Sequence, residues 1–113
     1  MNENCIFCKI VRGEVKSQTV HEDDDFLAFK DLNPQAPTHI LVVPKKHIPS
    51  LADCGKEDEA LLGRLQVVIR DLSKKLGLQS YRVLTNIGRQ AGQSVDHLHY
   101  HVLGGRRMAW PPG

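Results

Sequence analysis

The sequence predicts an α+β fold, built on a mainly antiparallel sheet of about five strands with one long helix. Apolar runs of strand length stand on both sides of a single long amphipathic segment. The connections between neighbouring strand-like runs are short enough for antiparallel pairing. The chain has 113 residues, which favours one domain over residues 1–113 with one modest core.

A hairpin over Thr19–Lys30 is the first expected element. Strand-like runs at Thr19–His21 and Phe26–Phe29 flank an acidic cluster that supplies the turn. Residues 31–37 form a loop that two prolines hold open. His39–Pro44 is a nearly continuous apolar and β-branched run, which is typical of a central buried strand that its proline ends.

One helix is expected from about Lys56 to Leu76. Its apolar residues recur at three- and four-residue spacing and form one face. They are Leu61, Leu62, Leu65, Val68, Ile69, Leu72 and Leu76. Acidic residues in the first turn and lysines in the last suit the helix dipole. Gly77 can end the helix, because glycine readily adopts the left-handed backbone conformation. Strands at Tyr81–Asn86 and Leu98–Leu103 follow, with a glycine-containing segment between them.

Composition excludes several classes of function. Fifteen Lys and Arg against thirteen Asp and Glu give a net charge of +2, too small to indicate a nucleic-acid partner. No apolar run exceeds four residues, so a membrane-spanning helix is not expected, and the first twenty residues contain no secretory apolar region. Three cysteines, an odd number, fit a reducing compartment better than a disulfide scaffold. We therefore expect a cytoplasmic protein without nucleic-acid or membrane partners.

Three of the six histidines fall at alternate positions of the last expected strand: His97, His99 and His101. Alternate residues of a strand share a face and lie about 7 Å apart, so these imidazoles project together. The opposite, core-facing side holds Leu98, Tyr100 and Val102. A solvated face or an incidental histidine-rich metal tract is the alternative, but a solvated face more usually carries Lys, Glu and Thr. We therefore favour a functional site.

These residue types suit chemistry at phosphorus. An imidazole is a good nucleophile at neutral pH when one nitrogen is free and the other is held as N–H, and carbonyls of the same strand can hold it. A second imidazole and the glycine-containing segment can donate to phosphate oxygens. Ser94, three residues before His97, can donate to a leaving group. Together they predict a phosphate-centred nucleophilic site without a catalytic metal.

His97–Leu103 reads His-φ-His-φ-His-φ-φ, where φ is hydrophobic, and it resembles the signature of the histidine triad family of nucleotide hydrolases and transferases. Further segments look like the Hint branch of that family: Asp31–His39, Pro44–Ile48, Gly92–Val95, and Leu103–Arg106 with Trp110–Gly113. The resemblance covers nearly the whole chain. It implies a HIT-like fold with a short N-terminal helix, a two-fold homodimer, and purine nucleotide substrates derived from AMP or GMP.

The resemblance implies catalytic roles. His99 would attack the α-phosphorus of a nucleoside 5′-monophosphate derivative and form a covalent nucleotidyl-histidine. His101 would hydrogen-bond the phosphate or the bridging atom and help the leaving group depart. Contacts to the phosphate and the departing amine would come from Ser94 and the Gly92–Gln93 backbone. Water would then release the nucleotide, which makes the enzyme a hydrolase.

Binding roles follow from the same resemblance. Asn86 would position the phosphate and sugar, and Asp31 would bind the ribose hydroxyls. The base would be sandwiched by Leu32 together with Phe7, Ile10 and Phe29. For the two phenylalanines, plain core packing is an equally good interpretation.

Cys5 and Cys8 have the spacing that lets two thiolates hold one tetrahedral metal. Two buried cysteines without a metal are the alternative. By resemblance to zinc-bearing relatives, His47 and His97 would complete a structural zinc site. His39 is the alternative fourth ligand, or else a partner that steadies the triad. No catalytic metal is expected.

The C-terminal tail carries Trp110, the only tryptophan. An aromatic side chain is costly to leave in water, and the resemblance places this one against the partner subunit near its active site; packing within its own chain is the alternative. Asp96 departs from the family pattern, which usually has an aromatic residue there. A carboxylate at this position could alter phosphate affinity or the pH dependence.

The leading function is hydrolysis of purine nucleoside 5′-phosphoramidates to the nucleoside 5′-monophosphate and an amine. One alternative is a dinucleoside polyphosphate hydrolase, as in another branch of the family. The other is a zinc-containing nucleotide-binding or interaction module without catalysis. Gly92–Val95 and the tail favour the first function, and the intact set of His99, His101, Ser94 and Asn86 speaks against the last.

Overall fold

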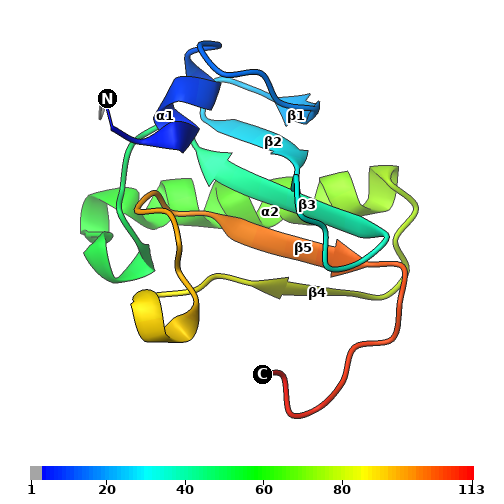
Figure 1. Cartoon of the computed structure of the whole chain (residues 1–113). Coiled ribbons are helices and arrows are strands. Elements are labelled where there is room, and N and C mark those ends of the chain that lie inside the picture. Colours follow the sequence, from blue (N-terminus) through cyan, green and yellow to red (C-terminus); the bar gives the residue numbers. More distant parts are fainter. Residues whose placement is uncertain (1–3) are drawn as a thin grey trace.

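A five-stranded antiparallel sheet forms the body of the molecule (Figure 1). The computed structural model describes residues 4–113. The strands run in the spatial order β1-β2-β3-β5-β4. Their bounds are β1 Thr19–Glu22, β2 Phe26–Lys30, β3 Thr38–Pro44, β4 Tyr81–Leu84 and β5 Tyr100–Gly104. The expected α+β class and antiparallel sheet are confirmed, and the central strand β3 is the run that the sequence marks as buried.

Two helices cover opposite faces of this sheet. The long helix α2, Glu59–Lys75, packs on one face through Leu65, Ile69 and Leu72. The short helix α1, Ile6–Val11, packs on the other face through Phe7 and Cys8. Alternate residues of β2 and β3 enter the two clusters, because successive side chains of a strand point to opposite faces. The site described below lies on the α1 face.

The long helix begins later than its sequence pattern indicates. Lys56–Asp58 forms a 3₁₀ turn, and the α-helix starts at Glu59. The buried carboxylate of Asp58 accepts a hydrogen bond from the backbone N–H of Gly55 at 2.9 Å. This bond caps the 3₁₀ turn, whose winding is tighter than that of an α-helix. Leu76 also departs from the expected apolar face: it lies beyond the last helical residue and is 39% exposed.

Both C-terminal strands are shorter than expected. β4 ends at Leu84, and the hydroxyl of Thr85 then donates to the carbonyl of His99 at 2.8 Å, in place of a ladder bond. β5 begins only at Tyr100. The preceding residues are anchored instead by the N–H of Leu98, which donates to the carbonyl of Ile48 at 2.6 Å. His97 and His99 therefore lie on an irregular approach to β5, not within it.

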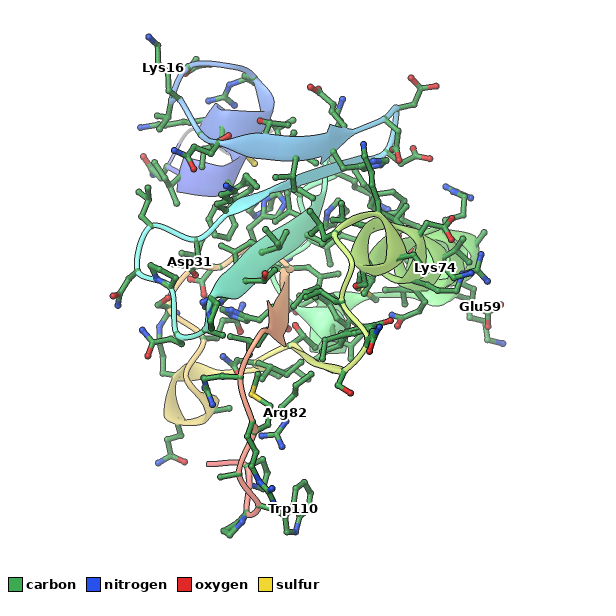
Figure 2. The ribbon with its side chains drawn as sticks, turned by 90° about the vertical axis from the view of Figure 1, so that its right-hand side faces the viewer. Lys16, Asp31, Glu59, Lys74, Arg82 and Trp110 are labelled. Atoms are coloured by element: carbon green, nitrogen blue, oxygen red, sulfur yellow. The ribbon has the colours of Figure 1, made fainter. Side chains whose placement is uncertain are left out.

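The C-terminal tail extends away from the sheet (Figures 1 and 2). Arg82 on β4 donates to the carbonyl of Ala109 at 3.0 Å, yet Trp110 is 83% exposed. Packing of this tryptophan within its own chain is therefore excluded. Within residues 4–113, no helix has the length and apolar character needed to cross a membrane.

Candidate active site and metal centre

His99 is held in one tautomer by the backbone. Its Nδ1 lies 2.7 Å from the carbonyl oxygen of His97, and a carbonyl only accepts, so Nδ1 must carry the proton. In the neutral ring the Nε2 lone pair is then free. His99 lines a cavity of about 290 Å³, and within residues 4–113 no side chain or carbonyl is bonded to its Nε2. This arrangement is what a nucleophilic imidazole requires.

A chain of hydrogen bonds sets the tautomer of His101. The backbone N–H of Gln35 donates to Nδ1 of His39 at 3.0 Å, so the proton of neutral His39 resides on Nε2. That Nε2–H lies 2.9 Å from Nδ1 of His101 and donates to it. The proton of His101 is therefore on Nε2, on the side away from His39. His101 lines the same cavity as His99 and offers it an N–H donor.

Burial keeps these rings neutral. Removal from water lowers the pKa of His39 and of His99. Burial, followed by repulsion from His99 and His39, lowers the pKa of His101 to about 4. Asp31 opposes each of these shifts, since its carboxylate favours the charged imidazolium. At neutral pH the site therefore contains one free imidazole nitrogen and one imidazole N–H donor.

The cavity has an apolar side and a polar side. Phe7 meets the ring of His99 edge to face with centroids 5.0 Å apart and the ring of Phe29 at 5.5 Å. Other lining residues named from the sequence are Ile10, Asp31, Leu32 and Ser94. Leu32 is 96% exposed and stands at the rim. A flat apolar group would fit against the phenylalanines, with the carboxylate of Asp31 beside it.

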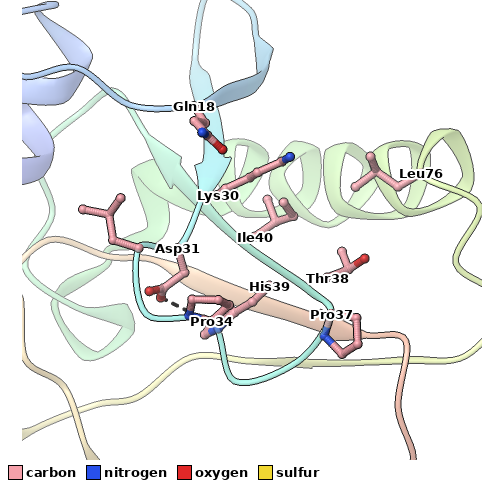
Figure 3. A pocket seen from close by; sticks show the side chains of 10 residues that line it. Gln18, Lys30, Asp31, Pro34, Pro37, Thr38, His39, Ile40 and Leu76 are labelled. Carbon is pink, nitrogen blue, oxygen red and sulfur yellow. Dashed lines mark ion pairs between the residues drawn. The ribbon is translucent and has the colours of Figure 1, made fainter.

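A larger cavity, of about 490 Å³, is lined mainly by residues at the end of β2, in the loop after it and at the start of β3 (Figure 3). It shares Asp31 and His39 with the site, and Asp31 Oδ2 lies 3.4 Å from Nε2 of His39. Neither His99 nor His101 lines it. Because His99 and His101 both line the smaller cavity, that cavity is the candidate active site.

The glycine-containing segment presents a different set of donors from the one the sequence suggests. The N–H of Gly92 donates to the carbonyl of Arg89 at 3.0 Å, and the N–H of Gln93 donates to that of Gly88 at 3.1 Å. Both groups are thus used inside the segment. The amide of Asn86 reaches back to the carbonyl of Gly92 at 3.5 Å. Ser94 lines the cavity, and its N–H has no acceptor within residues 4–113.

Sequence reasoning missed the residue that supports this segment. Gln93 is 5% exposed, and its side chain carries three hydrogen bonds. Its oxygen accepts the N–H of Gly88 at 2.9 Å, and its nitrogen donates to the carbonyls of Pro49 at 2.7 Å and Val95 at 3.1 Å. The sequence names Gln93 only for its backbone, because neither its burial nor its contact with Pro49 is visible before the chain folds.

Four metal-ligating side chains converge beside the site. They are Cys5, Cys8, His47 and His97. The sulfur of Cys8 lies 3.2 Å from Nδ1 of His47 and 3.6 Å from Nδ1 of His97. The sulfur of Cys5 lies 3.3 Å from Nδ1 of His97. Ligand atoms around a tetrahedral zinc are about 3.3–3.7 Å apart, from the usual bond lengths, so these spacings fit that ion.

The second ring nitrogen of His97 supports the same assignment. Nε2 lies 2.8 Å from the carbonyl of Pro44 and therefore carries the proton, which leaves the Nδ1 lone pair directed at the two sulfurs. Metal-binding histidines usually hold their other N–H in this way. Burial raises the pKa of the Cys5 thiol, and the N–H of Cys8, which donates to its sulfur at 3.3 Å, partly opposes that shift. His39 lies in the other histidine cluster, with His101 and Asp31, so His47 is the fourth member of this one.

Comparisons with known proteins agree with this fold. Residues 4–109 match the family model described as scavenger mRNA decapping enzyme C-terminal binding. A HIT-like protein of Synechocystis sp. is 49% identical over 114 residues, which is 100% of both chains. The HitA protein of Neisseria gonorrhoeae is 45% identical over 103 residues, with 90% of this chain and 96% of that protein covered.

Two solved structures are close in shape as well. A HIT family hydrolase from Legionella pneumophila superposes with a TM-score of 0.95 at 46% identity, covering 97% of this chain and 100% of that one. A histidine triad protein from Clostridium difficile gives a TM-score of 0.93 at 48% identity, with 96% of each chain covered. Family model, sequence identity and structure concur, and the chain belongs to the histidine triad family of hydrolase-like proteins.

Proposed function

We propose that the protein hydrolyses the P–N bond of purine nucleoside 5′-phosphoramidates. One observation carries the proposal: the backbone holds Nδ1–H of His99 and leaves its Nε2 lone pair free in a cavity that also contains the N–H donor of His101. A free nitrogen beside a fixed donor suits attack on a phosphorus whose oxygens carry negative charge.

The reaction would take two steps. In the first, Nε2 of His99 forms a bond to the α-phosphorus and the P–N bond to the amine breaks. The amine takes up one proton as it leaves, and the donors beside it are Nε2–H of His101 and the hydroxyl of Ser94. In the second step, water attacks the phosphorus and the bond to His99 breaks. One proton of that water returns to the donor, and the nucleoside 5′-monophosphate departs.

Substrate binding would use the two sides of the cavity. The base would lie against Phe7, Ile10 and Phe29, and exposed Leu32 would cover it. The ribose hydroxyls would bind Asp31, whose Oδ1 already accepts the N–H of Asn33 at 2.8 Å. Apolar walls recognise the shape of a purine more than its exocyclic groups, so derivatives of both AMP and GMP should bind.

The metal centre would hold one structural zinc. Cys5, Cys8, His47 and His97 supply four protein ligands, which is the composition of a closed zinc site. The ion would join α1 to the segment before β5 and so steady the backbone carbonyl that orients His99. It takes no part in bond breaking in this proposal. Two reduced thiols also suit a cytoplasmic location.

We further infer a two-fold homodimer formed through β4, an edge strand. Tyr81 and Val83 are 38% and 37% exposed on it, whereas exposed positions of the other edge strand, β1, are Thr19 and Glu22. An apolar sheet edge pairs readily with another copy, and such a dimer would give Trp110 a surface to cover. The dimer and its nucleotide substrate are the partners that we assign.

Replacement of His99 tests the nucleophile. The His99→Ala variant should lose at least about 100-fold in release of AMP from an adenosine 5′-phosphoramidate, followed by chromatography. AMP binding, measured by calorimetry, should change by no more than a few-fold, because other groups make most contacts. His21→Ala, outside the cavity, is the matched control. Wild-type protein that releases no AMP would overturn the proposal in favour of a dinucleoside polyphosphate hydrolase or a binding module.

Elemental analysis tests the zinc site. Protein purified without a histidine tag should contain about one zinc per chain. Cys8→Ser should lose the metal and unfold at a lower temperature. Cys54→Ser, at the remaining cysteine, should keep the zinc content and the unfolding temperature of wild type. Metal-free wild-type protein that is fully folded would contradict this assignment.

The buried histidines predict acid sensitivity. The pKa of His101 falls from 6.5 to about 4 on folding, so between these values the unfolded chain binds more protons than the folded chain. The contribution of His101 to the free energy of unfolding should therefore be fully present above about pH 6.5 and decrease as the pH drops toward 4. In urea titrations at about pH 7 and pH 5, His101→Gln should show a smaller drop than wild type. His21→Gln should show the wild-type drop, and an unchanged drop in His101→Gln would refute this account.

Light scattering tests the dimer. The solution mass should be twice the 12.7 kDa of one chain. Val83→Lys on β4 should shift the protein toward monomer, whereas Thr19→Lys on β1 should leave the dimer intact. A monomeric wild type, or equal effects of the two variants, would exclude pairing through β4.

A further inference from the structure

An ion pair joins the two ends of residues 89–96, the segment that precedes His97. Arg89 lies in the 3₁₀ turn Arg89–Ala91, and its NH2 group donates to Oδ2 of Asp96 at 2.8 Å. The side chains are 63% and 66% exposed, and surface pairs of this kind contribute little to stability by themselves.

The same guanidinium also holds a peptide group of the site. NH1 of Arg89 donates to the carbonyl of Gln93 at 2.5 Å. That carbonyl and the N–H of Ser94 belong to one planar trans peptide, so they point in opposite directions. Fixing the carbonyl toward Arg89 therefore fixes the Ser94 N–H on the opposite side. A cation on the carbonyl also polarises the peptide and makes its N–H a stronger donor.

The position of this peptide connects it with the departing group. Ser94 and Val95 line the cavity that contains His99 and His101. They also line a neighbouring cavity of about 310 Å³, whose wall includes Arg89 and Asp96. Ser94 thus stands between the two cavities. A group that departs from the phosphorus past Ser94 would therefore pass the N–H of Ser94 before it reaches the second cavity.

We propose that Arg89, locked by Asp96, is a positioning residue that aims the N–H of Ser94 at the leaving group, beside the Ser94 hydroxyl that the proposed function already assigns to it. The inference rests on the phosphoramidase function proposed above and adds a specificity consequence to it. A strongly basic alkylamine leaves poorly and depends on these donors, whereas a weakly basic arylamine leaves with less help. The ion pair therefore extends the range of substrates toward alkylamine phosphoramidates.

The test compares two adenosine 5′-phosphoramidates, one of an alkylamine and one of an arylamine. In Arg89→Met, kcat for the alkylamine substrate should fall about 10-fold and kcat for the arylamine substrate by about 2-fold or less, as expected for displaced donors. KM and AMP affinity should change little. Asp96→Asn should show the same pattern, and the double variant should lose no more than Arg89→Met, because both act through one peptide. Zinc content should match wild type in all three.

Arg64→Met is the matched control. Arg64 forms a comparable exposed ion pair with Asp25 at 3.1 Å. Neither residue lines the cavity of His99, so loss of this pair should leave both rates unchanged. Equal losses for the two substrates, or wild-type rates in Arg89→Met, would overturn the positioning role while the phosphoramidase function stands. Absence of turnover in wild type would instead overturn the function itself.

Discussion

The site depends on one kind of interaction: hydrogen bonds between backbone groups and imidazole nitrogens. The carbonyl of His97 holds Nδ1 of His99, the carbonyl of Pro44 holds Nε2 of His97, and the N–H of Gln35 is bonded to Nδ1 of His39. A neutral imidazole has one donor and one acceptor. Each backbone contact therefore decides what the other nitrogen can do, and in the function proposed above the three rings serve respectively as nucleophile, metal ligand and proton-bearing relay.

The same constraint connects the proposed metal centre with the proposed nucleophile, because both use one short segment of the chain. Within His97 the side chain belongs to the Cys/His cluster, and the carbonyl belongs to the hydrogen bond that orients His99. A structural ion on the ring would therefore restrain the carbonyl as well. Gln93 likewise makes two separate contacts: its side chain supports the segment, and its backbone carbonyl accepts a hydrogen bond from Arg89. Small shifts at either residue would reach the reacting groups without any direct contact.

Burial of the sheet between two helices keeps the histidine side chains uncharged. β3 is buried along its length, so His39 stands in a region poor in water and its pKa is lowered by burial. His101 on neighbouring β5 experiences the same effect. Neutral rings at physiological pH are needed both for a nucleophile and for a hydrogen-bond relay. A solvated strand face would leave the histidines partly protonated.

The sequence alone determined the secondary-structure order, the alternation that brings the histidines to one face, and the Cys5–Cys8 pair, because these depend on local spacing. It misplaced the end of β4 and the starts of β5 and α2. A side-chain hydrogen bond at Thr85 or Asp58, or the backbone bond from Leu98 to distant Ile48, replaces the regular pattern there. Only the tertiary structure decided that His47 joins the cysteines, that His39 joins His101, and that Arg89 meets the carbonyl of Gln93. The physical reason is that a tautomer or a donor direction is set by the group across the contact, and residues distant in sequence become neighbours only when the sheet is assembled.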